Sequence, residues 1–300
     1  MAVNELSLMK RRRALALGHL PWVLPAAVVI VFVFGYSVFA LFEQSFKYKD
    51  QWVGFENFDL VLGDSLFRTA IWHNTLLLAA VPVLVALGTA LALALFEVRN
   101  FVGLYRTAIF LPYILPIPVV GVVFGQLLQF NGALNSALRA LNLPGFALDW
   151  LGDPQLSLPT MGAIIIWKEV GFGAILILAR LMSLPYELFE AARIDGCNFW
   201  QMTRRVTIPQ LKTVLVFYFI NEAIVMVSWV FNYVYVMTNG QGGPGDSTFV
   251  SELYIYREAF QNQAPELAAA AAVMLLVATS VFIVGLFTMQ RKMSKGMFND

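Results

Sequence analysis

Charged residues are scarce in this sequence: they make up 13% of its 300 residues, whereas soluble domains average about 25%. Apolar residues make up 59%. This imbalance over the full length excludes an ordinary soluble domain and indicates a membrane protein. The net charge is only +1, and the charges are divided among separate loops instead of forming one basic face. We therefore expect no nucleic-acid partner.

Residues for metal binding and catalysis are also nearly absent. The single cysteine, Cys197, excludes a disulfide framework and a cysteine-rich metal site. His19 and His73 are far apart and form no H-E-x-x-H pair, and no G-x-x-x-x-G-K-[ST] phosphate-binding loop occurs. We predict a chain that is not an enzyme, with no metal site and no cofactor, and that depends on a partner for energy. A membrane-embedded enzyme is the disfavoured alternative.

Long apolar runs are what the sequence does contain. A helix needs about 20 residues to cross a hydrocarbon core of about 30 Å, and lipid forces the backbone to satisfy its own hydrogen bonds. The first run is too long for a cleaved signal peptide. Prolines fall inside the runs, among them Pro82, Pro112, Pro116 and Pro118, and membrane helices tolerate the kinks they cause. The sequence predicts an all-α membrane protein with six transmembrane helices at residues 21–42, 74–96, 107–130, 158–181, 213–237 and 267–289.

The distribution of lysine and arginine predicts the orientation. If the N-terminus is inside, 13 of these residues fall on inner segments and 5 on outer segments, while Lys168 and Arg180 lie within a span. Such an excess marks the cytoplasmic side. Both termini are therefore expected in the cytoplasm: an N-terminal segment at 1–20, a transmembrane domain at 21–290 and a tail at 291–300.

The loop at residues 183–210, SLPYELFEAARIDGCNFWQMTRRVTIPQ, is unusually polar for this sequence and lies on the predicted cytoplasmic side. Its sequence predicts two short helices. Gly196 is suited to end the first, because glycine takes the left-handed cap without strain. Asn198 and Gln201 have the spacing of a capping box that opens the second, which is expected to end before Pro209. An ordinary connector between two spans is the alternative interpretation.

Part of this loop, EAARIDGCNFWQMTRRVTIPQL, resembles the Glu-Ala-Ala loop of permease subunits in binding-protein-dependent ABC importers. Cys197 departs from the family pattern, in which a small alanine is commoner. Segments 53–76, 111–124 and 235–260 resemble sugar-importer permeases of the maltose/lactose type, although residues 239–241 lengthen the glycine turn and leave the substrate open. The matching loop residues are Glu190, Ala191, Ala192, Asp195, Gly196, Ile208 and Pro209.

The resemblance implies a type I ABC importer permease bundle in the cytoplasmic (inner) membrane, with a cytoplasmic coupling helix. It implies a heterodimer with a second permease subunit, two ATP-binding subunits, an extracytoplasmic solute-binding protein and a sugar substrate. A permease for another small solute remains an alternative. The residues implied in ATPase coupling are Tyr186, Glu187, Phe189, Glu190, Ala191, Ala192, Arg193, Asp195, Gly196 and Phe199.

Charged residues inside predicted spans are costly and mark a pathway or a buried pair. We predict that Lys168 in the fourth span pairs with Glu222 in the fifth, although Glu169 could compete for the lysine. Direct contact with substrate is the alternative. An ion- or proton-coupled secondary carrier could use the same three residues as a relay, but the Glu-Ala-Ala loop would then have no purpose.

The fifth span supplies the remaining candidates for the substrate path. On a continuous helix, Tyr218, Glu222, Trp229 and Asn232 would share one face. A tryptophan beside an amide suits a sugar, which offers apolar C–H faces and hydroxyl groups. An interfacial aromatic belt is the alternative. The predicted substrate-path residues are Lys168, Glu222, Trp229, Asn232 and Tyr233.

Overall fold

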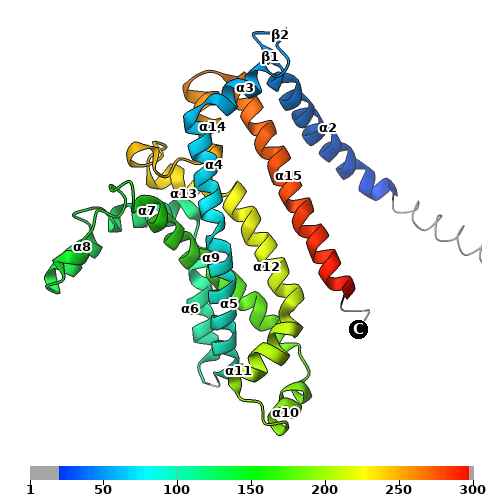
Figure 1. The fold of residues 1–300 in the computed structure, drawn as a ribbon, viewed down its shortest axis with the longest axis vertical. Coiled ribbons are helices and arrows are strands. Elements are labelled where there is room, and N and C mark those ends of the chain that lie inside the picture. Colours follow the sequence, from blue (N-terminus) through cyan, green and yellow to red (C-terminus); the bar gives the residue numbers. More distant parts are fainter. Residues whose placement is uncertain (1–19, 99, 297–300) are drawn as a thin grey trace, which may run out of the picture.

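A computed structural model describes residues 20–98 and 100–296 of the chain (Figure 1). The expected N-terminal segment at 1–20 lies almost entirely outside the described residues, as do the last four residues of the expected tail. Helices make up most of the described part. Its strands form one short antiparallel hairpin after the C-terminal end of the first long helix.

The elements follow one another in a simple order. The first half contains α2 (Leu20–Ser45), β1 (Lys47–Tyr48), β2 (Gln51–Trp52), α3 (Glu56–Gly63), α4 (Ser65–Leu78), α5 (Ala80–Glu97), α6 (Val102–Ile114), α7 (Ile117–Leu127), α8 (Ala133–Ala140) and the 3₁₀ turn η1 (Pro144–Phe146). The second half contains α9 (Ser157–Met182), α10 (Tyr186–Ile194), α11 (Phe199–Met202), the π-turn η2 (Thr203–Thr207), α12 (Ile208–Ser228), α13 (Val230–Met237), η3 (Pro244–Asp246), α14 (Ser251–Tyr256), η4 (Arg257–Gln261) and α15 (Pro265–Gly296).

The prediction of an all-helical membrane bundle is confirmed. Within the described residues, five helical stretches are long and apolar enough to cross a membrane, and a sixth is possible if the bent pair α6 and α7 counts as one span. The five stretches are 22–45, 65–97, 157–182, 199–228 and 265–288.

The third predicted span is not the continuous helix expected over 107–130. Helix α6 ends at Ile114, α7 begins at Ile117, and their axes differ by 92°. Pro116 causes the break, because a residue before proline avoids the helical region and Leu115 accordingly has ψ of 133°. Pro116 is itself extended, with ψ of 136°, and Pro118 then sits in the first turn of α7, where proline is tolerated.

The fifth predicted span, 213–237, is also interrupted. Trp229, with φ of −125° and ψ of −6°, separates α12 from α13. Helix α13 packs against α7, and the approach is close because a Cβ on Gly121 would lie 2.7 Å from Val236 Cγ1. Tertiary packing thus overrides the local helical period. The expectation that Tyr218 and Asn232 share a face of one helix is therefore wrong.

The expected stop before Pro209 is wrong as well. Helix α11 continues through the π-turn η2 into α12, so that one helical stretch covers Phe199–Ser228. Pro209 lies in the first turn of α12, where its missing N–H costs little.

Helix α9 is the centre of the bundle. It packs against α5, α6 and α12, and 61% of its most apolar window is buried, against 0% for α2. Helix α2 contacts α15 near the strand hairpin and otherwise stands apart, whereas α8 reaches away from the long helices (Figure 1). Helices α10 and α11 lie at the same end of the molecule as the last turns of α15, opposite the strand hairpin (Figure 1).

Candidate functional site

A cavity of about 610 Å³, lined by apolar side chains and by the polar Lys168, Glu169 and Asn221, opens where α6 breaks, beside the middle of α9 and the last turns of α12. Helix breaks of this kind frame substrate sites in membrane transporters, because the unwound backbone can line a cavity. The described residues that line the cavity are Phe110, Tyr113, Ile114, Ile117, Lys168, Glu169, Asn221, Val225 and Trp229.

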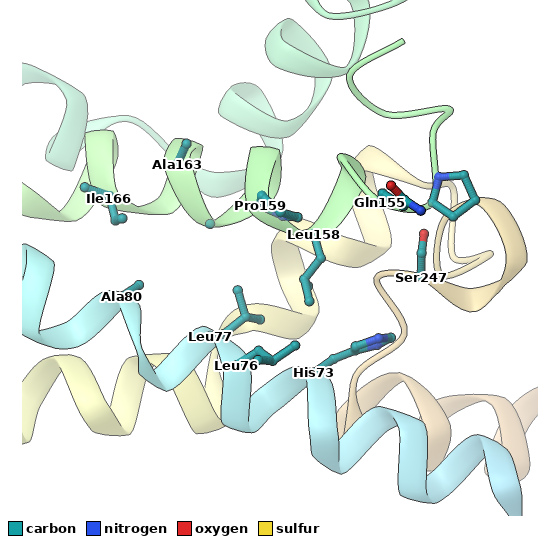
Figure 2. A pocket seen from close by; sticks show the side chains of 12 residues that line it. His73, Leu76, Leu77, Ala80, Gln155, Leu158, Pro159, Ala163, Ile166 and Ser247 are labelled. Atoms are coloured by element: carbon teal, nitrogen blue, oxygen red, sulfur yellow. The ribbon is translucent and has the colours of Figure 1, made fainter. Parts of the chain in front are cut away.

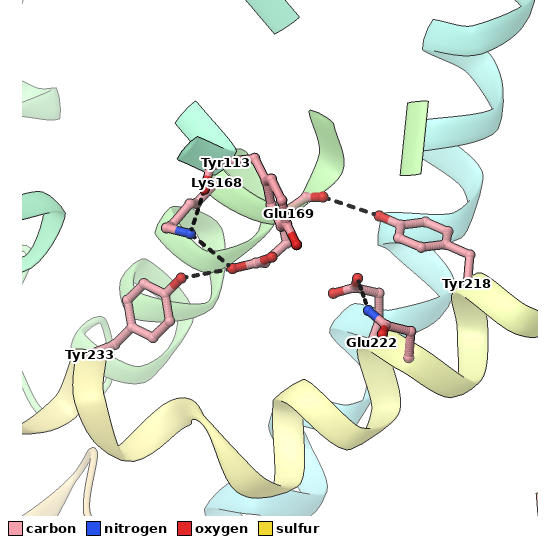
Figure 3. Close-up of polar contacts among 7 residues, drawn as sticks. Tyr113, Lys168, Glu169, Tyr218, Glu222 and Tyr233 are labelled. Carbon is pink, nitrogen blue, oxygen red and sulfur yellow. Dashed lines mark hydrogen bonds and ion pairs between the residues drawn. The ribbon is translucent and has the colours of Figure 1, made fainter. Parts of the chain in front are cut away.

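Lys168 and Glu169 form a buried ion pair at this cavity (Figure 3). Lys168 Nζ donates to Glu169 Oε1 at 3.3 Å and to the Tyr113 carbonyl oxygen at 3.2 Å. The Tyr233 hydroxyl donates to the same Glu169 oxygen at 3.0 Å. The two charged side chains are 6% and 8% exposed, so protein groups rather than bulk water stabilise them.

The predicted pairing of Lys168 with Glu222 is wrong. Glu222 is completely buried, and one of its oxygens accepts a hydrogen bond from Asn221 Nδ2 at 3.2 Å. Its other oxygen has no hydrogen-bond partner among the described residues. Lys168 forms its ion pair with the neighbouring Glu169 instead, because adjacent residues on α9 can pair without spanning the gap to α12.

Removing Lys168 should therefore be rescued by a change at Glu169 and not by one at Glu222. Lys168→Met leaves the Glu169 carboxylate buried without its cation, which costs about 3–5 kcal/mol in buried pairs. We expect Lys168→Met to reduce the amount of assembled permease, measured by size-exclusion chromatography of the solubilised complex. Adding Glu169→Gln should recover much of the loss. A stronger recovery with Glu222→Gln would contradict the observed pairing.

A second cavity, of about 510 Å³, lies between α4 and α9 (Figure 2). Apolar side chains line most of it, with His73, Gln155 and Ser247 gathered at one end (Figure 2). Two of these polar groups are already engaged: His73 Nδ1 donates to the Phe249 carbonyl at 2.8 Å, and the hydroxyls of Ser157 and Ser247 are 2.7 Å apart. The cavity beside α6 is therefore the better candidate for a polar solute.

The structure brings together four of the five predicted substrate-path residues. Lys168 and Trp229 line the cavity, while Glu222 and Tyr233 lie behind its wall as part of the polar cluster. Asn232 is half-buried on α13 and does not line the cavity. The break at Trp229 explains the difference, because it turns α13 away from the line of α12.

Sequence reasoning left Tyr113, Asn221 and Glu169 out of the predicted substrate path. Tyr113 supplies the carbonyl that binds Lys168, and its ring stacks on Phe172 with centroids 5.0 Å apart. The signal that could have located it is the pair Pro116 and Pro118, since a proline-interrupted apolar segment points to a site at the interruption.

The loop after α9 has well-formed helix ends. The Gly196 N–H donates to the Arg193 carbonyl at 3.0 Å and the Cys197 N–H to the Ala192 carbonyl at 3.0 Å, the bonding pattern of a Schellman cap. Gly196 has φ of +76°. The capping box expected at α11 is present: Asn198 Oδ1 accepts from the Gln201 N–H, and Gln201 Oε1 accepts from the Asn198 N–H, both at 2.9 Å.

The predicted coupling residues divide into two groups. Phe189 and Ala192 are buried against their own chain, and the Phe189 ring contacts that of Phe96 on α5 with centroids 5.5 Å apart. Ala191 and Ala192 do not form one outer surface of α10, since only Ala191 is exposed. The residues that face outward are Tyr186, Glu187, Glu190, Ala191, Arg193, Asp195, Gly196 and Phe199.

Large apolar side chains are also exposed on this loop. Ile194 is 85% exposed and Trp200 is 76% exposed. Apolar patches outside the lipid-facing surface mark interaction sites. Among the described residues, no group of three or more histidine, cysteine, aspartate or glutamate side chains could hold a metal ion.

An all-helical bundle of apolar spans, with a broken helix beside a polar cavity, defines a membrane transport subunit. Residues 85–297 match the family described as binding-protein-dependent transport system inner membrane component. Diacetylchitobiose uptake system permease protein NgcF of Streptomyces coelicolor is 33% identical over 94% of this chain and 85% of its own length. Lactose transport system permease protein LacF of Rhizobium radiobacter is 31% identical over 73% of this chain and 74% of its own.

The fold is found among solved structures too. One chain from the crystal structure of a bacterial alginate ABC transporter, in complex with an alginate pentasaccharide-bound periplasmic protein, superposes with a TM-score of 0.80 at 25% identity. The alignment covers 96% of this chain and 98% of that chain. This chain belongs to the family of inner-membrane permease subunits of binding-protein-dependent ABC importers. It is a transport subunit and not an enzyme, and the secondary-carrier alternative is excluded.

Proposed function

We propose that this chain forms half of the translocation pathway of an ATP-driven carbohydrate importer. The observation that carries the proposal is the cavity beside α6, which is lined by the aromatic rings of Tyr113 and Trp229 and by Asn221. Aromatic faces suit the C–H surfaces of a sugar and the amide suits its hydroxyl groups. NgcF and LacF, named for diacetylchitobiose and lactose, support a saccharide substrate.

A second permease subunit is proposed to complete the pathway as a heterodimer. The cavity beside α6 is only partly enclosed by this chain. Helix α2 buries almost none of its surface in its own bundle. A helix that is apolar all round needs lipid or another subunit as its surroundings.

The importer is proposed to contain two ATP-binding subunits, one of which docks on α10 and α11 of this chain. The exposed Ile194 and Trp200 supply an apolar contact surface, and buried Phe189 fixes α10 to Phe96 at the end of α5. Movement of α10 would therefore reach α5, which packs along α9 beside the cavity. On this proposal α10 is the coupling helix. The end of the molecule with α10 and the last turns of α15 is then cytoplasmic. A solute-binding protein delivers sugar at the opposite end.

ATP-dependent uptake tests the proposal directly. The permease pair, ATP-binding subunits and solute-binding protein would be reconstituted in proteoliposomes and supplied with labelled neutral disaccharides. We expect uptake that requires both internal ATP and the binding protein. Uptake driven by an ion gradient without ATP, or uptake confined to solutes other than saccharides, would overturn it.

Trp229→Ala should weaken sugar handling without reducing assembly. Trp229 is 55% exposed and lines the cavity, so its loss removes an aromatic contact and little packing. We expect the half-saturating sugar concentration to rise roughly fivefold, the equivalent of about 1 kcal/mol. Trp72, on α4, is 59% exposed and does not line the cavity. Trp72→Ala is the matched control and should transport normally; equal effects of both changes would place the site elsewhere.

A further inference from the structure

The charged residues at the cavity bear on which saccharides it can bind. We infer that the cavity admits saccharides without acidic groups and excludes carboxylated ones, and that Glu169 sets this selectivity by keeping Lys168 engaged. The inference rests on the proposed function and adds to it the charge class of the substrate.

A sugar carboxylate needs a cation whose charge is not already paired with another carboxylate. Among the described residues that line the cavity, Lys168 supplies the positive charge. Its ammonium group has three N–H donors; one is directed to Glu169 Oε1 and another to the Tyr113 carbonyl. The ammonium also lies 5.2 Å from the centre of the Tyr113 ring, within range of a cation–π contact. Lys168 is thus already neutralised by its own protein.

The groups around the cavity leave no positive charge unpaired. Glu169 neutralises Lys168, and Glu222 adds a second carboxyl group beside the same cluster (Figure 3). Glu222 accepts a hydrogen bond from Asn221 and pairs with no cation among the described residues, so it supplies no positive charge either. A carboxylate entering the cavity would lose its hydration shell without gaining a cation.

The rest of the lining is compatible with a neutral saccharide. Asn221 offers an amide, and Tyr113 and Trp229 offer aromatic surfaces. Neither kind of group requires a charge on the ligand. The shared fold does not decide the question, because the structural relative at 25% identity is a transporter of alginate, described as an acidic polysaccharide. Selectivity depends on the site residues and not on the fold.

Direct binding to the purified complex, without the solute-binding protein, tests the inference on the unmodified protein. Labelled neutral disaccharides of glucose and galactose would be compared by equilibrium dialysis with their C6-oxidised counterparts, which differ by a carboxylate in place of a hydroxymethyl group. We expect the neutral forms to bind about tenfold or more tightly, the equivalent of about 1.4 kcal/mol. Comparable binding of both forms would overturn the inference. Binding of neither form would count against the proposed function itself.

Glu169→Gln provides a second test, because it removes the partner of Lys168 and leaves a buried cation. An oxidised disaccharide could then supply the missing negative charge, and ligand binding raises the stability of the folded state. We expect the C6-oxidised disaccharides to raise the unfolding temperature of Glu169→Gln more than the neutral ones do, reversing the order in the unmodified complex. An unchanged order would contradict a role for Glu169.

Two further variants separate this effect from a simple change of net charge. Glu222→Gln removes the second carboxyl group but leaves the Lys168–Glu169 pair intact, so it should not reverse the order. Glu252 on α14 does not line the cavity; it accepts a hydrogen bond from Asn74 at 3.3 Å, and burial raises the pKa of its carboxyl to about 7. Glu252→Gln should leave selectivity unchanged. Reversal in either variant would assign the selectivity to overall charge instead of to Lys168.

Discussion

Gly196→Val is expected to abolish ATP-driven uptake while the permease remains assembled in the membrane. Gly196 has φ of +76°, and no other atom lies within 4 Å of a Cβ built on it. The strain would therefore come from the backbone alone, about 1–2 kcal/mol or more for a residue forced into the left-handed region. Relief requires opening the cap, which would lose the bonds from Gly196 and Cys197 to the last carbonyls of α10.

An open cap would change the angle between α10 and α11 and thus separate Ile194 from Trp200, the proposed contact surface for the ATPase. Uptake and co-purification of the ATP-binding subunits measure the effect. Gly196→Asn should retain much of the activity, because asparagine tolerates the left-handed region.

Gly54 offers a matched control at the opposite end of the molecule. It has φ of +64° and likewise no atom within 4 Å of a built Cβ, so Gly54→Val imposes similar backbone strain far from α10. We expect it to transport sugar and to retain the ATPase. If Gly196→Val behaved in the same way, α10 and its cap would not couple the permease to ATP hydrolysis.

The sequence was sufficient for the features that depend on composition and local chemistry. Six apolar runs predicted the helical bundle, and Gly196, Asn198 and Gln201 predicted the helix ends in the loop after α9. These features depend on residues close together in the chain, where glycine conformation and side-chain capping act directly. The resemblance of that loop to the Glu-Ala-Ala motif also indicated the correct family, because the motif is a short run of contiguous residues.

The features that sequence could not predict depend on contacts between distant segments. Nothing local at Trp229 indicates a break; it accompanies the packing of α13 against α7, which no periodicity records. The predicted pairing of Lys168 with Glu222 likewise failed, because the side chain pairs with the adjacent Glu169 and the Tyr113 carbonyl. That carbonyl lies at the end of α6, where the proline break follows.

The close approach of α6 to α9 predicts the second large effect. A Cβ on Gly171 would lie 2.1 Å from the Ile109 carbonyl oxygen and 3.2 Å from Phe110 Cα. Both are backbone atoms, so no side-chain rotation can relieve the overlap and α6 itself must move. Overpacking of this kind typically costs about 1–3 kcal/mol, occasionally more. We expect Gly171→Ala to lower the unfolding temperature of the solubilised permease and to reduce uptake, because the Lys168–Tyr113 bond crosses the same interface.

Gly162, on the same helix, is the matched control for this prediction. A Cβ there would meet Leu77 Cδ2 at 3.7 Å, an ordinary contact. Glycine inside a helix is about 1 kcal/mol less favourable than alanine, so Gly162→Ala should be neutral or stabilising. Helix propensity alone would predict the same gain for Gly171→Ala. Opposite shifts of the unfolding temperature in the two variants would therefore attribute the requirement for Gly171 to the packing of α6 on α9, and equal shifts would refute it.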